Sequence, residues 1–238
     1  MSTGIGDAVK RKEDKRFTTG KGKYTDDVRN DNQAYAAFVR SPHAHARVTG
    51  IDASAALAMD GVIDVLNGAQ LTGDGIGNII CGWAVTSKDG SPMNMGAWSA
   101  LATEKVRYVG DAVAVVIAET QALARIAAEA VEVSYEQLPV AANIEASMAD
   151  GAPEIHSNAP GNMIYDWELG DETATDAGLA GAAHVTTLDV INNRLSPNPM
   201  EPRSAVATYD NSEEHYTLYT TSQNPHVARL VLSAFYNV

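Results

Sequence analysis

VRYVGDAVAVVIAETQALARIAAEAVEVSYEQLP, residues 106–139, carries the clearest structural pattern in the sequence. Residues 112–118 form a continuous apolar run rich in valine, which is typical of a strand buried on both faces. Thr120 can then cap a helix in which apolar side chains recur at the spacing of one buried stripe. These side chains are Leu123, Ile126, Ala127 and Ala130. The stretch therefore begins as a strand followed by an amphipathic helix.

The period changes to two at Val131, and the alternation of apolar and polar residues predicts a second strand that Pro139 ends. Two strands joined by a helix of this length predict a parallel pair with a right-handed crossover. A second strand-helix-strand unit is predicted from residues 48–51, 53–59 and 62–66, after a strand at residues 34–40. We therefore expect an α/β fold for the first half of the chain.

Length and charge limit the possible functions. The chain has 238 residues, of which 17 are basic and 30 acidic, for a net charge of −13. Such a surface repels phosphate backbones and anionic lipid, so we expect neither nucleic acid nor a membrane as partner. The first 16 residues lack the apolar core of a signal peptide and no apolar run could span a membrane, which favours a cytoplasmic protein.

Three short features suggest reactive or ligand sites. GKGK at residues 20–23 lacks the further glycine, the Ser or Thr after lysine and the preceding strand of a phosphate loop, so we predict a turn. His43 and His45 could hold a metal, but no third ligand lies nearby in the sequence, so we predict structural hydrogen bonds. Cys81, the single cysteine, excludes an internal disulfide and an iron–sulfur cluster held wholly by this chain. A nucleophilic role for it would need a base that spacing does not reveal.

The composition changes after Pro139, and DGAPEIHSNAPGN at residues 150–162 is the best linker in the sequence. We expect proteolysis of the isolated chain to begin there. Beyond the linker the patterns predict strands at residues 164–169, 185–191, 205–209 and 215–221, a short helix at 175–183, and a last helix from Pro225 to about Phe235 with Asn224 as its cap.

Five motifs occur in the order found in one protein family. They are RSPHAHAR (residues 40–47), YVGDAVA (108–114), VSYEQLP (133–139), NPMEPR (198–203) and TSQNPH (221–226). With these motifs the chain resembles the N-terminal part of the large, molybdenum-binding subunit of the xanthine oxidase and aldehyde oxidase family, and is most similar to the aerobic carbon monoxide dehydrogenase type.

The resemblance implies a fold of the α/β (α+β) class in two parts. Residues 1–149 would hold an N-terminal segment and an α/β hammerhead domain, and residues 150–162 would be the linker. Residues 163–238 would begin a mixed α+β molybdopterin-binding domain, which is expected to be incomplete because the family's later cofactor-binding segments lie beyond Val238.

The resemblance also implies a molybdenum hydroxylase that oxidises a small carbon substrate, which could be carbon monoxide, an aldehyde or an N-heterocycle. The complete subunit would bind a molybdopterin-type molybdenum cofactor, in the cytosine dinucleotide form. Electrons would pass through 2Fe-2S clusters to FAD on an iron–sulfur small subunit and an FAD-binding medium subunit, in a dimer of heterotrimers. The residues that select the substrate lie in the absent part.

One site residue can be carried over from the family. Gln223, in TSQNPH, matches a glutamine whose amide donates a hydrogen bond to an oxygen ligand of molybdenum, and its place before a helix N-terminus suits an anionic group. Glu201 and Arg203 are predicted to be structural, as a buried pair or as turn-holding contacts. The family's glutamate base lies beyond Val238, so we expect no catalytic residue here and no activity of the chain alone.

A non-catalytic role is the alternative. The sequence ends three residues after its last predicted helix, so the chain could be a fragment, or a split structural subunit whose cofactor site needs a partner. The reading frame after Val238 would distinguish these possibilities.

Overall fold

The computed structural model describes residues 4–238, which form two compact units. The larger unit holds Asn32–Asp189 and Asn224–Val238, and the smaller unit holds Met1–Asp31 and Val190–Gln223. By this division residues 150–162 lie inside the larger unit, and the domain boundary predicted there stays a prediction.

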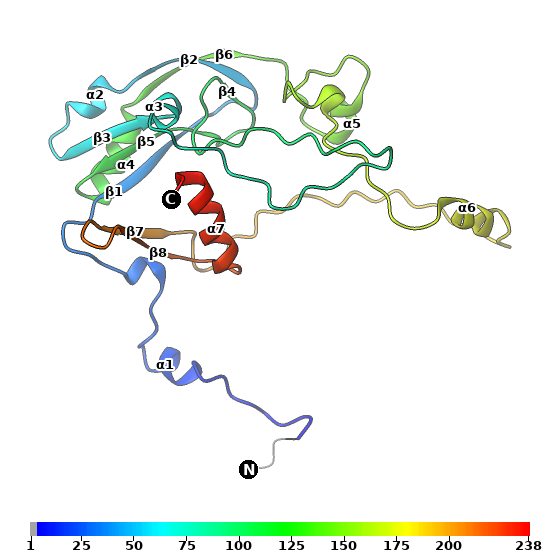
Figure 1. Cartoon of the computed structure of the whole chain (residues 1–238), viewed down its shortest axis with the longest axis horizontal. Coiled ribbons are helices and arrows are strands. Elements are labelled where there is room, and N and C mark those ends of the chain that lie inside the picture. The colour runs from blue at the N-terminus through cyan, green and yellow to red at the C-terminus, as the bar shows by residue number, and fades with distance from the viewer. Residues whose placement is uncertain (1–3) are drawn as a thin grey trace. The chain divides into compact units, whose positions relative to one another are not determined.

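One sheet of the larger unit is organised around the apolar run at residues 112–118 (Figure 1). That run is β5 (Ala112–Ala118), the central strand, between β1 (Tyr35–Arg40) and β3 (Val62–Asn67). Both pairings are antiparallel. Val113 and Val116 are fully buried, as expected for a strand that is covered on both faces.

A second sheet has the order β4 (Lys105–Val106), β2 (Ala46–Asp52), β6 (Glu132–Gln137), and its pairings are also antiparallel. The predicted parallel pairing of the strands before and after the long helix is therefore wrong. β5 already has both edges occupied by β1 and β3, so the chain after the helix enters the other sheet. The earlier unit crosses in the opposite direction, with β2 in the second sheet and β3 in the first.

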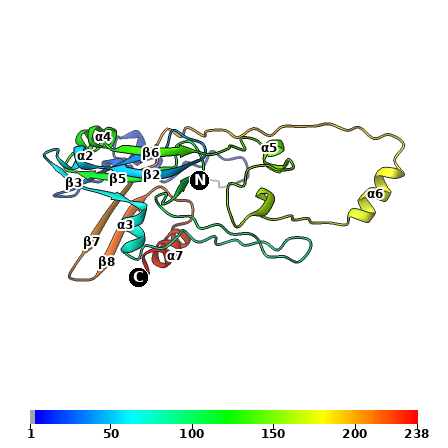
Figure 2. The ribbon, with the colours of Figure 1, turned by 90° about the horizontal axis from the view of Figure 1, so that it is seen from above.

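Helix α4 (Gln121–Glu129) packs on the first sheet beside the short helix α2 (Ser54–Leu57), as Figure 2 shows. The Thr120 side chain accepts a hydrogen bond from the Leu123 amide at 3.2 Å, which confirms the predicted cap. The predicted stripe is confirmed at Ala127 and in part at Leu123 and Ala130, which are half-buried, but it is wrong at Ile126. Ala124 and Ala127 are fully buried, whereas Ile126 is 58 % exposed, because the close approach of the helix to the sheet admits only small side chains.

Residues 150–162 are held in place by hydrogen bonds to neighbouring segments. Asn162 accepts a hydrogen bond from the Ile155 amide at 2.9 Å and donates to the carbonyls of Ser147 and Pro153 at 2.9 and 3.0 Å. Ala159 is almost completely buried. The segment lies between helix α5 (Ile144–Met148) and the end of the 3₁₀ turn η2 (Pro160–Asn162). This anchoring makes the segment a poor site for the first proteolytic cut.

The strands predicted at residues 164–169 and 185–191 do not form. Their alternating apolar side chains are largely exposed, and within the described residues neither segment joins a sheet. A strand needs a neighbour for its backbone groups, so alternation alone does not suffice. The short helix is α6 (Glu172–Ala180), slightly earlier than predicted, because Asp171 accepts a hydrogen bond from the Ala174 amide and begins it.

Two further helices complete the larger unit. Helix α3 (Gly68–Gly73) is not among the predicted elements, and in it Asn67 and Gln70 form a reciprocal capping box. The last helix, α7 (Pro225–Tyr236), has the predicted bounds, with Pro225 at the first position. Asn224 occupies the N-cap position, but its side chain does not make the predicted capping hydrogen bond. None of the helices within residues 4–238 has the length and apolar character that a membrane crossing requires.

The smaller unit is built on a hairpin. β7 (Ala205–Asp210) and β8 (His215–Thr220) pair antiparallel in register from Ala205–Thr220 to Asp210–His215. The unit also contains α1 (Asp14–Thr18) and the 3₁₀ turn η1 (Thr25–Asp27), and η1 contacts β7. Both strands were predicted from their alternation, and the closed end of the hairpin is set by Asp210, which accepts hydrogen bonds from the Ser212 and Glu213 amides.

Candidate functional site

Three of the five motifs meet within the larger unit and hold one another in place. The Ser41 amide donates to the Asp111 carbonyl, and the Gly110 amide donates to the Ser41 carbonyl, both at 2.8 Å. The Leu138 amide donates to the carbonyl of His45 at 3.0 Å. Ser41 and His45 are both buried. RSPHAHAR, YVGDAVA and VSYEQLP are therefore brought together by backbone contacts that stabilise the fold.

His45 makes the structural hydrogen bond predicted for it. Its Nδ1 lies 2.7 Å from the carbonyl oxygen of Pro139, so Nδ1 carries the proton and donates. His43 packs edge-on against the Tyr135 ring with the centroids 4.9 Å apart. Within the described residues, no group of three or more His, Cys, Asp or Glu side chains is arranged to hold a metal ion.

This region also contains polar groups that the sequence did not reveal. His45 Nε2 and the Tyr135 hydroxyl are buried without a hydrogen-bond partner among the described residues, and burial raises the pKa of Tyr135. His156, from the predicted linker, packs here, and its pKa is lowered by burial and then by the neighbouring Arg107 and His45. Only folding brings His156 near the motif, so a motif search could not have found it.

The other two motifs meet at the open end of the β7–β8 hairpin. NPMEPR ends at Arg203, just before β7, and TSQNPH begins at Thr221, just after β8. Because Ala205 pairs with Thr220, these strand ends are adjacent, and the Thr220 hydroxyl donates to the Ser204 carbonyl at 3.1 Å. The hairpin thus brings together two motifs that are far apart in the sequence.

Gln223 lies in the loop that leaves this open end, between Thr220 and the first residue of α7. Its side chain is exposed and makes no hydrogen bond to any described residue. The amide is therefore available to donate to a bound group. The twelve-residue helix that follows presents its N-terminal amides and the positive end of its dipole, which favour an anion.

Glu201 and Arg203 have different environments. The Glu201 carboxylate accepts a hydrogen bond from the Thr25 amide at 3.3 Å, which ties η1 to the segment before β7. Arg203 is exposed, and no ion pair joins it to Glu201 within residues 4–238. Of the two structural roles predicted, the turn-holding contact applies to Glu201 and the buried pair does not form.

The remaining sequence candidates do not converge on a site. Gly20, with φ of +69°, ends α1: its amide donates to the Phe17 carbonyl, and the Lys21 amide donates to the Arg16 carbonyl. The turn predicted for residues 20–23 is therefore found at its start, at Thr19 and Gly20, and residues 21–23 have no regular structure. Cys81 is exposed in the long loop after α3.

Two family models match the chain. The a/b hammerhead domain of aldehyde oxidase and xanthine dehydrogenase matches residues 19–139, and the molybdopterin cofactor-binding domain matches residues 155–238. The first match contains the three motifs that stabilise the larger unit. The second contains both motifs at the open end of the hairpin.

Known proteins are similar along nearly the whole chain. The carbon monoxide dehydrogenase large chain of Afipia carboxidovorans is 36 % identical over 97 % of this chain and 29 % of its own length. The large molybdopterin subunit of nicotinate dehydrogenase from Eubacterium barkeri is 32 % identical over 88 % of this chain and 45 % of its own. A crystal structure of Cu,Mo-CO dehydrogenase in the carbon monoxide reduced state superposes with a TM-score of 0.83, at 36 % identity, over 98 % of this chain and 30 % of that chain. The chain therefore spans less than half of each of these proteins.

Proposed function

We propose, from the premise that the chain belongs to the aldehyde oxidase and xanthine dehydrogenase family, that it is the first part of the large subunit of a molybdenum hydroxylase. The observation that carries this proposal is the molybdopterin cofactor-binding match over residues 155–238, which includes the open end of the hairpin and Gln223. The similarity to the carbon monoxide dehydrogenase large chain, on both sequence and fold, supports it.

The residues present fit a molybdenum cofactor. An exposed amide donor at Gln223 is followed directly by the N-terminus of α7, and both features favour a ligand with negative charge. The Gln223 amide would donate a hydrogen bond to the cofactor and orient it. The cofactor, when bound, would supply the oxidation of the substrate carbon.

The electrons would leave through partner subunits. The single cysteine of residues 1–238 cannot hold an iron–sulfur cluster. In line with the family resemblance, the clusters and FAD would lie on an iron–sulfur small subunit and a flavin medium subunit. The cytosine dinucleotide form of the cofactor, the dimer of heterotrimers and a cytoplasmic location remain predictions. Substrates in the range of carbon monoxide, aldehydes and N-heterocycles are the class to test.

The test is purification of the complete large subunit with its co-purifying partners. We expect molybdenum, iron and flavin in fixed proportion, and reduction of an electron-accepting dye with at least one substrate of that class. A homogeneous complex without molybdenum would refute the proposal. Reconstitution with molybdenum that restores dye reduction would support it further.

A split subunit is the second candidate, and one observation favours it. The nicotinate dehydrogenase large molybdopterin subunit is covered to 45 % by this chain, against 29 % for the carbon monoxide dehydrogenase large chain, so its length is much shorter. In a split subunit, Gln223 would complete its cofactor site only with a second molybdopterin subunit. Intact mass of the native polypeptide that contains residues 1–238 distinguishes the two arrangements.

A further inference from the structure

Basic side chains are concentrated in one short part of this acidic chain. We call residues 10–23, KRKEDKRFTTGKGK, the basic segment. It holds seven of the 17 basic residues and two of the 30 acidic ones, so it carries +5 while the remaining chain carries −18. Its basic residues are Lys10, Arg11, Lys12, Lys15, Arg16, Lys21 and Lys23.

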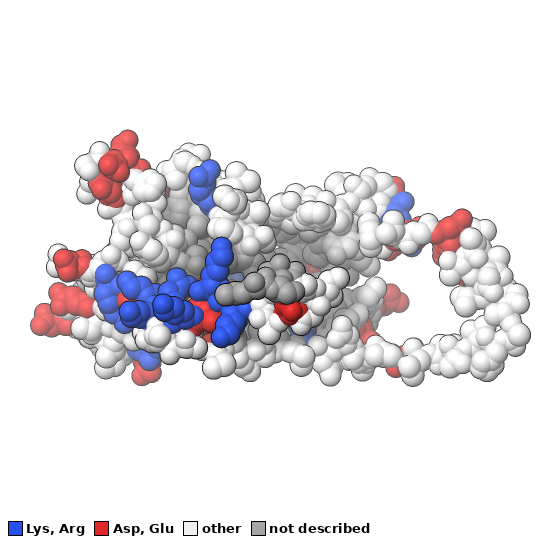
Figure 3. All heavy atoms as spheres, turned by 90° about the horizontal axis from the view of Figure 1, so that it is seen from below, with Lys and Arg blue, Asp and Glu red and all other residues white. Residues whose placement is uncertain are grey.

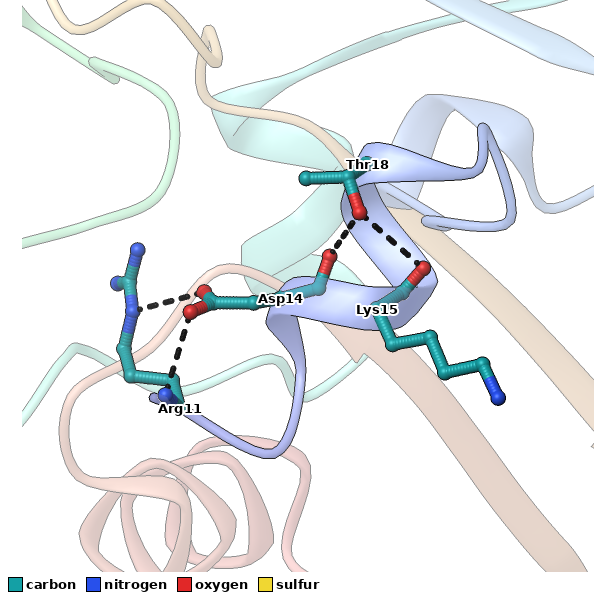
Figure 4. A network of polar contacts seen from close by, with 4 residues as sticks. All are labelled: Arg11, Asp14, Lys15 and Thr18. Atoms are coloured by element: carbon teal, nitrogen blue, oxygen red, sulfur yellow. Dashed lines mark hydrogen bonds and ion pairs between the residues drawn. The ribbon is translucent and has the colours of Figure 1, made fainter. Parts of the chain in front are cut away.

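The basic segment is folded locally rather than extended. Asp14, the first residue of α1, accepts hydrogen bonds from the amide and the Nε of Arg11, and the Thr18 hydroxyl donates to the Asp14 carbonyl at 2.7 Å (Figure 4). After the turn at Gly20, the Phe17 ring lies so close to Gly22 that a Cβ on Gly22 would come within 2.7 Å of it. Lys15 and Arg16 thus lie in α1, and the other five basic residues flank the helix on both sides.

These charges have few partners of their own. Every basic side chain of the segment is exposed, and the only ion pair that the segment makes within residues 4–238 joins Arg11 to Asp14. Figure 3 shows one dense gathering of basic side chains on the face drawn there, whereas the acidic side chains on that face are scattered. Like charges held this close repel one another, so a surface of opposite charge would be attracted to them.

We propose that the basic segment docks on an acidic surface of a partner subunit in the hydroxylase complex. Nucleic acid fits less well, because a long polyanion would extend past the segment and meet a chain that otherwise carries −18. An acidic patch on a folded protein has finite size and avoids this repulsion. Most of the charges are lysines, which act as mobile point charges and suit a carboxylate-rich surface.

The location of the segment indicates which partner it serves. It leads directly into η1, whose Thr25 amide is bound by Glu201 of NPMEPR, at the open end of the hairpin. Docking would therefore bring the partner to the unit that carries Gln223. The partner that must lie near the cofactor is the one that receives its electrons, so this inference rests on the proposed function.

The experiment measures association of the complete large subunit with its separately purified iron–sulfur subunit by biolayer interferometry, at 50 and 300 mM NaCl. The test variant carries Lys12→Gln, Lys15→Gln and Lys21→Gln. The control variant also removes three exposed positive charges, by Arg125→Gln, Arg194→Gln and Arg229→Gln. We expect the test variant to bind about tenfold more weakly at 50 mM NaCl, mostly through a slower association rate, and the control variant to bind like the unaltered subunit. At 300 mM NaCl the difference should disappear.

Equal weakening by both variants, or none by the test variant, would overturn the docking proposal. The unaltered pair decides independently of variant folding, since an association rate that does not fall between the two salt concentrations also overturns it. Tight binding of a 20-base-pair DNA duplex by the unaltered subunit, lost in the test variant, would overturn the choice of a protein partner. Molybdenum content, measured on the same preparations, tests the proposed function separately.

Discussion

Replacing Asn162 should release the segment that packs against α5 and covers part of the larger unit. Its side chain makes three hydrogen bonds, to Ile155, Ser147 and Pro153, all in a partly buried setting. At roughly 0.5–1.5 kcal/mol for each bond, and with water replacing part of the loss, Asn162→Gly should destabilise the local structure by about 2 kcal/mol. Glycine keeps the left-handed backbone, because φ at this position is +58°.

Asn162→Ala separates the side-chain bonds from the backbone. It loses the same three bonds and also places a Cβ in the left-handed region, which adds about 1 kcal/mol. The two variants should therefore differ in a fixed order, with alanine the less stable.

Hydrogen exchange at the Ile155 amide is the direct assay. A loss of about 2 kcal/mol corresponds to exchange about 30-fold faster in Asn162→Gly, while amides in β5 should exchange at the unaltered rate because the opening is local. Asn192→Gly, at an exposed position, is the matched control. Unchanged exchange at Ile155 in Asn162→Gly would refute the view that these three bonds hold the segment, and restore it as a flexible linker.

Three other changes test separate parts of the structure. Gly68→Ala should lower the free energy of unfolding by about 1–3 kcal/mol in a urea titration, because a Cβ there would lie 2.8 Å from two backbone carbonyl oxygens. In the control Gly73→Ala, in the same helix, the added Cβ meets open space, so the free energy of unfolding should not fall. Lowering the pH below the ordinary histidine pKa of 6.5 should destabilise the larger unit, because the pKa of His156 is lowered in the folded state and the unfolded chain therefore binds more protons. His156→Gln should remove that part of the pH dependence, as measured by thermal unfolding. In the complete complex, Gln223→Glu should lower turnover about 10- to 100-fold, because a hydrogen bond to a charged group is lost. Molybdenum content, measured by mass spectrometry, should change little, and full activity would exclude the proposed role of the amide.

Local signals in the sequence predicted most elements of the larger unit correctly. The apolar run of β5 and the Thr120 cap depend on neighbours in the chain, and both are confirmed. Strand pairing depends on residues far away in the sequence, and the predicted parallel pairing is wrong. A strand-helix-strand pattern predicts that the helix carries the chain back along the first strand. It does not predict which sheet receives the second strand.

The same limit applies to the candidate site. A family resemblance points to Gln223, and local patterns predict its place between a strand and a helix N-terminus. The meeting of NPMEPR with TSQNPH could not be predicted, because it depends on the hairpin register that pairs Ala205 with Thr220. Residues 185–191 have the alternating pattern of a strand but no neighbouring strand in the described chain. The alternation there indicates that the segment is able to form a strand, and it does not show that a partner strand is present.

The crossing of both strand-helix-strand units between the two sheets has a consequence for synthesis on the ribosome. Tyr35 pairs with Ala118, and Ala46 pairs with Gln137, so the first strands made must wait for the last ones. The first sheet can pair only after β5 has been made, and the second sheet must wait longer, until β6 has been made. The apolar strands β1 and β3 would therefore remain accessible to chaperones until β5 has left the exit tunnel, and β2 would remain unpaired with β6 for longer still.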